Sequence, residues 1–243
     1  MILVLQIYEN SLQKCSKTIS TQGCTEYSNL VENVHHEPVL LTQYRINLSV
    51  ICYICAMRCN YCGKDFDAKE IRSVNVQLNP ELKAAVKDGT LFVHECPHCG
   101  KAVLSTGAFL YHDPQEHLLI ALSASELSAE SLEGYTCRRV STVGELIEKV
   151  NIFDAGLDDV IMELCKYVTL QEMGKNVPLK FFRIGPDGEI TLAYPEKGEM
   201  QMLAIGHNVY SDCAAIIQRN QPLRDSIHGL AKIDQEWLSH FIA

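Results

Sequence analysis

The chain contains two nearly identical cysteine turns, Cys59-Asn60-Tyr61-Cys62-Gly63 and Cys96-Pro97-His98-Cys99-Gly100. Two residues between the cysteines let one tight turn present both sulfurs to a tetrahedral ion. The glycine after each pair tolerates the left-handed backbone that such a turn needs, and a proline fixes φ in the second turn. These two turns, called knuckles from here on, predict one structural Zn²⁺ in a closed site made by Cys59, Cys62, Cys96 and Cys99.

The spacing between the knuckles predicts secondary structure of its own. Thirty-three residues separate Cys62 from Cys96, whereas a plain zinc ribbon has about 15–20. Alternating apolar and polar residues predict a strand over residues 66–77. Asn79 as N-cap, Pro80 at the first position and Gly89 after the end predict a helix over residues 82–88, and a second strand is expected at residues 91–93.

Downstream of the knuckles the hydrophobic period changes. Apolar residues around a turn at residues 113–116 predict a β-hairpin, so that residues 57–123 form a β-rich zinc-ribbon module. Residues 124–243 form an α+β C-terminal part: helices at 143–153, 157–174 and 210–219, a three-stranded antiparallel meander over 177–205, and an apolar tail at 237–242. The predicted fold class is therefore α+β, a β-rich zinc-ribbon module followed by helices and a meander.

Residues 1–56 carry scattered polar and charged residues without a sustained period of 2 or 3.6. Two interpretations stay open for this leader. It is either a poorly ordered extension or the product of an upstream mis-start, with Met57 as the natural first residue. The roles of Cys52 and Cys55 depend on which of these holds.

Composition narrows the class of protein. The 243 residues include 11 cysteines and carry a net charge of −9. The acidic balance argues against a dedicated nucleic-acid binder, which needs a cationic face. No apolar run is long enough to span a membrane, and the first residues lack a secretory signal, so a cytoplasmic location is expected. Cysteines in a reducing compartment indicate metal binding rather than disulfides.

A sharper alternative uses the same cysteines. Cys55, Cys59 and Cys62 follow the C-x-x-x-C-x-aromatic-C pattern that resembles the iron–sulfur motif of radical SAM enzymes, in which three thiolates hold the cluster. Those enzymes continue into a partial α/β barrel, whereas a β-rich segment and a second knuckle follow here. The zinc interpretation is therefore preferred, and the iron–sulfur enzyme remains the alternative.

Other polar residues receive ordinary interpretations. Asp154, Asp158 and Asp159 lie near the start of a predicted helix, where carboxylates complement the helix dipole. Histidines near the knuckles are not expected to be metal ligands, because four thiolates already complete a zinc coordination shell. Three cysteines in helical or strand patterns are expected to be buried apolar residues: Cys137, Cys165 and Cys213.

Together with the knuckles, several stretches resemble the CpXC domain family, zinc-knuckle proteins of bacteria and archaea. They lie at residues 73–76, 79–82, 88–92, 110–113 and 152–159. The resemblance covers about residues 57–170 and implies that the four knuckle cysteines are the family's signature residues. The family usually has a proline where this chain has Asn60, which should loosen the first turn without removing a ligand. No biochemical activity follows from the resemblance.

The preferred function is thus a zinc-stabilised scaffold or protein-interaction module with an unknown protein partner, and more an interaction protein than an enzyme. No catalytic triad, phosphate loop or carboxylate pair stands out in the sequence. A nucleic-acid-binding zinc ribbon is the second alternative. It is disfavoured because residues 57–123 carry seven basic and eight acidic side chains, and four thiolates around Zn²⁺ add further negative charge.

Overall fold

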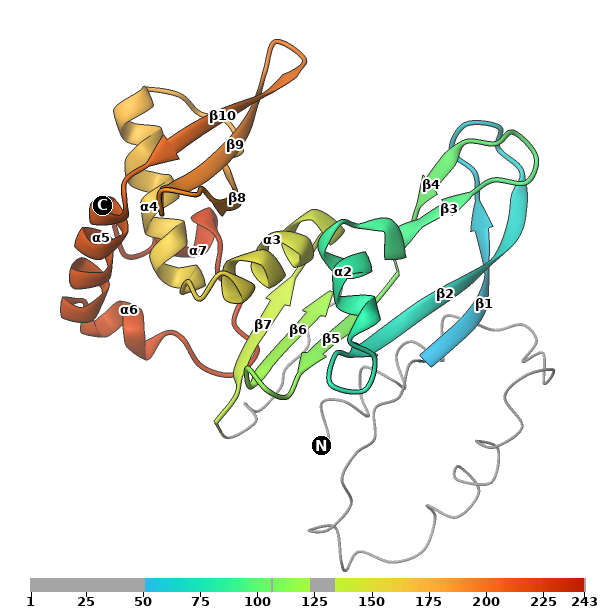
Figure 1. Cartoon of the computed structure of the whole chain (residues 1–243), viewed down its shortest axis with the longest axis horizontal. Coiled ribbons are helices and arrows are strands. Elements are labelled where there is room, and N and C mark those ends of the chain that lie inside the picture. Colours follow the sequence, from blue (N-terminus) through green and yellow to red (C-terminus); the bar gives the residue numbers. More distant parts are fainter. Residues whose placement is uncertain (1–50, 106, 123–133, 243) are drawn as a thin grey trace, which may run out of the picture.

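The computed structural model describes residues 51–105, 107–122 and 134–242 (Figure 1). Within them a five-stranded sheet has the order β1-β2-β5-β6-β7, a three-stranded sheet the order β10-β9-β8, and β3 pairs with β4. The strands are β1 (Ile51–Arg58), β2 (Asp65–Asn75), β3 (Val93–Glu95), β4 (Ala102–Leu104), β5 (Phe109–Asp113), β6 (Leu118–Leu122), β7 (Thr136–Val140), β8 (Lys180–Ile184), β9 (Ile190–Glu196) and β10 (Glu199–Ile205). The helices are α2 (Glu81–Lys87), η1 (Thr90–Phe92), α3 (Val143–Asp154), α4 (Asp159–Met173), α5 (His207–Arg219), α6 (Gln221–Asp225) and α7 (Gln235–Ser239). The predicted α+β class is confirmed.

Two hairpins project from the body of the molecule as an arm (Figure 1). The first is formed by β1 and β2, which pair antiparallel and are joined by the first knuckle. The second is the β3–β4 hairpin, joined by the second knuckle. Phe66 and Ala68 of β2 pack against Val103 of β4, and the residues that alternate with them on β2 are exposed, as the period of a half-buried strand requires.

The centre of the molecule is the five-stranded sheet with α2 and α3 packed on it (Figure 1). The predicted β5–β6 hairpin is present, with Phe109 opposite Leu122. β6 is buried along its whole length, as expected for a strand with neighbours on both sides. Its neighbour β7 runs parallel to it. The core of this central unit lies between the sheet and the helices and includes Phe92, Ile120 and Leu146.

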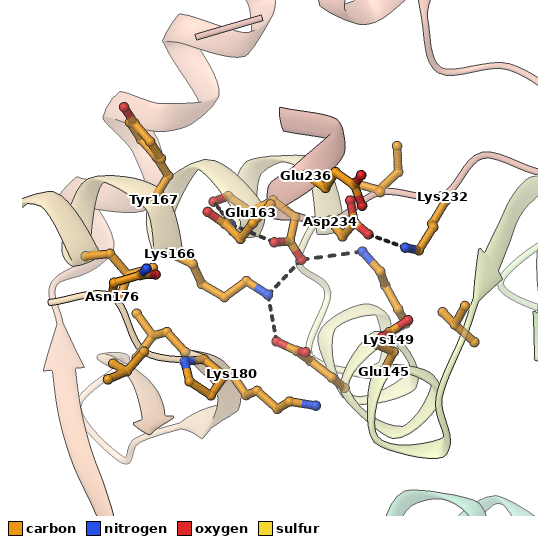
Figure 2. A pocket seen from close by; sticks show the side chains of 18 of the residues that line it. Glu145, Lys149, Glu163, Lys166, Tyr167, Asn176, Lys180, Lys232, Asp234 and Glu236 are labelled. Carbon is orange, nitrogen blue, oxygen red and sulfur yellow. Dashed lines mark hydrogen bonds and ion pairs between the residues drawn. The ribbon is translucent and has the colours of Figure 1, made fainter. Parts of the chain in front are cut away.

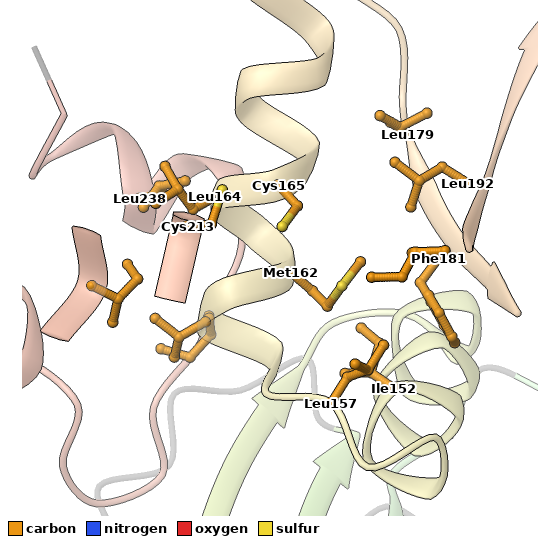
Figure 3. Close-up of a cluster of buried hydrophobic side chains, with 14 of the residues drawn as sticks. Ile152, Leu157, Met162, Leu164, Cys165, Leu179, Phe181, Leu192, Cys213 and Leu238 are labelled. Carbon is orange, nitrogen blue, oxygen red and sulfur yellow. The ribbon is translucent and has the colours of Figure 1, made fainter. Parts of the chain in front are cut away.

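The C-terminal unit consists of α4, the three-stranded sheet β8–β10 and helices α5 to α7. Asp158 caps α4 by accepting hydrogen bonds from the backbone N–H groups of Val160 and Ile161. The apolar face of α4 packs between the sheet and the last helices, with Met162 and Leu164 buried (Figure 3). The predicted meander is confirmed, since β9 pairs antiparallel with both β8 and β10. The apolar tail also packs back, with Leu238 buried in the same cluster.

Three sequence-based boundaries differ from the structure. β1 begins at Ile51, so residues 51–56 of the predicted leader belong to the sheet, while residues 1–50 lie outside the described residues. The division at residue 123 is not where the packing divides, because β7 and α3 join the sheet and core of residues before it. Residues 90–92 form a 3₁₀ turn rather than a strand, and the strand starts at Val93. In the first two cases partners far along the chain decide the conformation, whereas the 3₁₀ turn is closed locally by the Phe92 N–H, which donates to the carbonyl oxygen of Gly89.

Candidate metal centre

Each knuckle is closed by the same two backbone hydrogen bonds. The N–H of Gly63 donates to the carbonyl oxygen of Cys59, and that of Gly100 donates to Cys96, both at 2.8 Å. The N–H of the first cysteine donates in turn to the residue after the glycine, at 2.9 Å in both knuckles. Gly63 and Gly100 have φ values of +71° and +67°, a region where a Cβ atom is unfavourable. The sequence-based argument for these two glycines is confirmed.

The four sulfurs of Cys59, Cys62, Cys96 and Cys99 all lie within 4.8 Å of one another. Two contacts cross between the knuckles: Cys59 Sγ is 3.6 Å from Cys99 Sγ, and Cys62 Sγ is 3.8 Å from Cys96 Sγ. A tetrahedral ion with Zn–S bonds of about 2.3 Å separates its sulfurs by about 3.8 Å. The four-cysteine cluster therefore has the spacing to hold one metal ion.

Burial differs between the two cysteines of each knuckle. Cys59 and Cys96 are fully buried and belong to the small core of the arm, together with Phe66 and Val103. Cys62 and Cys99 lie at the surface. The first cysteine of each knuckle thus anchors the cluster in the protein, and the second closes it from the solvent side.

The thiols of the cluster influence one another's ionisation. Burial raises the pKa of Cys59, but hydrogen bonds from the backbone N–H groups of Cys62 and Tyr61 and from neighbouring thiols lower it to about 6. At Cys99 a hydrogen bond from the Lys101 N–H lowers the pKa, whereas burial and hydrogen bonds with the other thiols raise it to about 12. Four adjacent thiols resist joint ionisation, and a bound cation removes this resistance.

Other metal-ligating side chains near the knuckles have different partners. His98 Nε2 lies 3.3 Å from the backbone oxygen of Asp65. The His112 ring contacts the Asn75 amide at 3.5 Å and the Tyr135 hydroxyl at 3.3 Å. Within residues 51–105, 107–122 and 134–242 the cluster of possible ligands around the knuckles contains cysteines alone.

Cys55 is not part of this cluster. Its sulfur lies 3.4 Å from Nη2 of Arg72, whose guanidinium also pairs with Glu70. The side chain of Cys52 lies outside the part of the chain whose side chains are described. The structure thus groups Cys59 and Cys62 with the second knuckle, and not with Cys55 as a three-cysteine iron–sulfur motif requires.

The aspartates and the remaining cysteines singled out in the sequence are also placed. Asp158 caps α4, as the dipole interpretation predicts. Asp159, by contrast, is fully buried and pairs with Arg138 and Lys149, so that interpretation was too simple. Asp154 pairs with Lys83 and Lys87. The three cysteines expected in the core are buried: Cys137, Cys165 and Cys213.

Comparison with known proteins identifies the region that contains the cluster. No curated protein and no solved structure matches the chain. Among the described residues, no helix combines the length and apolar character needed to cross a membrane. Residues 57–166 match the model of one family, described as CpXC protein. The match starts just before the first knuckle, includes all four cysteines of the cluster and ends within α4. Residues 57–166 of this chain are a CpXC protein family domain.

Proposed function

We propose that the four-cysteine cluster binds one structural Zn²⁺ and that the protein acts as a zinc-stabilised interaction module. The main support is the distance between sulfurs of different knuckles, 3.6 Å for Cys59 and Cys99 and 3.8 Å for Cys62 and Cys96. These distances fit a single tetrahedral ion. Four thiolates favour zinc or iron among the metals available to proteins. Four protein ligands leave no open coordination position, and this is typical of a structural site.

The arm gives the zinc ion a clear structural role. Its buried residues are few: Cys59, Phe66, Ala68, Cys96 and Val103. Two of the five are themselves cysteines of the cluster. So small an apolar core stabilises two hairpins weakly, whereas a structural zinc typically contributes about 10–16 kcal/mol of apparent binding free energy that is also folding free energy. Zinc would join the two hairpins where packing alone is insufficient.

The surface of the arm supports binding of a protein rather than of nucleic acid. Tyr61, at the tip of the first knuckle, is 63% exposed. Val93 and Leu104 face each other across the β3–β4 hairpin and are 46% and 52% exposed. Exposed aromatic and aliphatic side chains are typical of protein interfaces. Asp65 and Asp67 lie exposed on β2 together with Lys69, so this face carries mixed charge rather than the cationic surface of a nucleic-acid-binding ribbon.

Metal analysis of two matched variants tests the zinc site. The protein and its Cys99→Ser and Cys55→Ser variants are purified without oxygen, and zinc, iron and sulfide are measured together with the visible absorption spectrum. The cluster geometry predicts one zinc per chain and a colourless protein, loss of the zinc in Cys99→Ser, and retention in Cys55→Ser. A brown protein that contains iron and sulfide and loses both in Cys55→Ser would instead establish the iron–sulfur alternative.

A further inference from the structure

A cavity of about 590 Å³ lies where β7, α3, α4 and the loop before α7 meet (Figure 2). Its floor contains an unusual group of buried charges from α3 and α4. The side chains of Lys149 and Lys166 are each only 5% exposed, and both line the cavity. Lysine is rarely buried unless it is paired, so the partners of these ammonium groups decide what the cavity accepts.

The buried charges form one continuous ion-pair network. Its members alternate in sign: Arg138, Asp159, Lys149, Glu163, Lys166 and Glu148. The three cations balance the three anions. Burial lowers the pKa of Lys166, but Glu148 and Glu163 raise it above its usual value, so this lysine stays charged. The network is therefore electrically neutral, although it lies under an open cavity.

The two glutamates of the floor, Glu148 and Glu163, already accept hydrogen bonds from the protein. Glu148 Oε1 accepts from Lys166 Nζ and from the backbone N–H of Phe181, each at 2.9 Å. Glu163 Oε1 lies 2.7 Å from Lys166 Nζ, and Glu163 Oε2 accepts from Gln235 Nε2 at 2.8 Å. Both oxygens of Glu163 and one oxygen of Glu148 are therefore engaged by the protein itself.

The ammonium groups, by contrast, have donors left over. Lys149 Nζ lies 2.8 Å from Asp159 Oδ2, and its next acceptor, Glu163 Oε1, is 3.7 Å away. This second distance exceeds a hydrogen bond, so at most one of three N–H donors is used by these carboxylates. Lys166 Nζ uses two donors, on Glu148 and Glu163. Both nitrogens approach the same oxygen of Glu163, so the spare donors lie close together.

Four further cations line the same cavity. Lys175 and Lys232 pair with Glu196 and Asp234, which leaves Arg139 and Lys180. Within the part of the chain that the structure describes, neither side chain forms an ion pair. The Lys180 ammonium lies near the start of α3, 3.0 Å from the position that a Cβ atom on Gly144 would take. A positive charge there is disfavoured by the helix dipole, and an anion beside it would offset this cost.

We propose that this cavity binds a small molecule through an oxyanion, a carboxylate or phosphate group held by Lys149 and Lys166 at the floor and by Lys180 at the rim. The engaged oxygens of Glu148 and Glu163, the spare ammonium donors of Lys149 and Lys166, and the unpaired Arg139 and Lys180 favour an acceptor of hydrogen bonds that carries negative charge. A network that only joined α3 to α4 would be expected to be covered by side chains rather than to face a cavity.

Calorimetric titration with two anions tests the proposal and shows whether the bound group is a phosphate or a carboxylate. Inorganic phosphate and succinate are titrated into the full-length protein, with sodium chloride at equal ionic strength as the blank. Lys180→Gln is the test variant, since Lys149→Gln removes a partner of the buried Asp159 and is expected to impair folding. Lys69→Gln, which removes an exposed lysine of β2, is the matched control.

The expected result is saturable binding of one anion, weakened about tenfold or more by Lys180→Gln and unchanged by Lys69→Gln. The anion that binds more tightly identifies the source as phosphate or carboxylate. Absence of saturable binding of both anions at about 10 mM, in a protein that is folded by circular dichroism, overturns the proposal. Equal affinities of the Lys180→Gln and Lys69→Gln variants overturn it as well.

Discussion

The arm and the C-terminal unit solve the same problem of stability in different ways. The core of the arm has five buried residues, two of which are cysteines of the cluster. The C-terminal unit buries a cluster that draws on α4, the β8–β10 sheet and the last helices (Figure 3). Burial of apolar area stabilises a fold in proportion to its extent. The comparison gives the proposed zinc ion its role, because it would stabilise the region in which little apolar surface is available.

The central unit lies between these two regions and is joined to each differently. β2 passes directly from the arm into the five-stranded sheet. On the other side, the ion-pair network connects β7 and α3 with α4, and Glu148 of α3 also binds the backbone of β8. The arm is thus an extension of the sheet, while the C-terminal unit shares a buried polar interface with it.

The largest effect is expected from removing one ligand of the cluster. Cys96→Ser leaves three thiolates and loses zinc, and with it much of the ~10–16 kcal/mol that such an ion typically contributes. Limited proteolysis with mass spectrometry should find new cleavage within residues 57–69 and 93–104, while β8–β10 stay protected by their own core. Chelation of zinc from the unchanged protein should give the same fragments.

Equally fast digestion of the C-terminal unit in that experiment would show that the chain unfolds as one cooperative unit around the metal. The contrast between arm and C-terminal unit would then be wrong. Survival of the arm in Cys96→Ser would show instead that its small apolar core is sufficient by itself.

Breaking the ion-pair network should lower the stability of the helical region and leave the metal site of the arm intact. Asp159→Asn leaves Arg138 and Lys149 without their shared carboxylate in a buried site, which typically costs about 3–5 kcal/mol. Urea denaturation should show this loss while the zinc content stays unchanged. Asp187→Asn, in the exposed β8–β9 turn, is the control and should change stability by less than about 0.5 kcal/mol. A cost below about 1 kcal/mol for Asp159→Asn would show that the network contributes little.

Acidification should open the arm at a higher pH than the C-terminal unit. Metal-bound thiolates are lost to protons as the pH falls, so zinc leaves first and the arm opens. Burial raises the pKa of Asp159, but Lys149 and Arg138 hold it below its usual 3.8. A carboxylate with a lowered pKa in the folded state contributes stability above its unfolded-state pKa, and that stability is lost as the pH falls through the folded-state value. The C-terminal unit should therefore persist to lower pH than the arm.

A zinc indicator and far-ultraviolet circular dichroism, recorded across one acid titration, check this order. Zinc release is expected at a higher pH than the main loss of helical signal. Coincidence of the two transitions would mean that the arm and the helical region depend on the same groups.

The smallest effect concerns one of the two differences between the knuckles, the residue after the first cysteine. Asn60 and Pro97 occupy equivalent positions in turns with the same backbone hydrogen bonds. Asn60→Pro should reduce the freedom of the unfolded turn and stabilise the first knuckle by about 0.4–1 kcal/mol. The measurement is the chelator concentration that removes half of the zinc, which should rise in Asn60→Pro and fall in Pro97→Asn. Loss of zinc from Asn60→Pro would show that the first turn does not accept proline.

Local sequence patterns predicted the elements whose signals are themselves local. The helix expected at residues 143–153 is present and is capped by Thr142, whose hydroxyl accepts from the Glu145 N–H at 3.1 Å. The meander and the knuckle turns could likewise be predicted, because turn residues and glycines mark them directly in the sequence. The four candidate ligands were identified from their spacing alone, and their sulfurs are found together.

The features that were missed depend on long-range partners. β7 was not predicted, and its place in the sheet comes from parallel pairing with β6. Residues 51–56 lack a hydrophobic period, yet β1 pairs along the length of β2. Charged residues within a helix are usually expected on its solvated face. The packing of α3 against α4 instead buries Glu148, Glu163 and Lys166 as ion pairs. Charge pairing between helices leaves no spacing signal in one sequence.

X-ray absorption at the metal edge tests the central claim most directly. The fully loaded protein is expected to show a zinc edge and a single shell of four sulfurs at about 2.3 Å. The Cys55→Ser variant should give the same spectrum, since its sulfur lies beside Arg72 and outside the cluster. An iron edge with sulfide bridges, or a zinc shell that contains nitrogen or oxygen in place of sulfur, would contradict the assignment of a closed four-thiolate zinc centre.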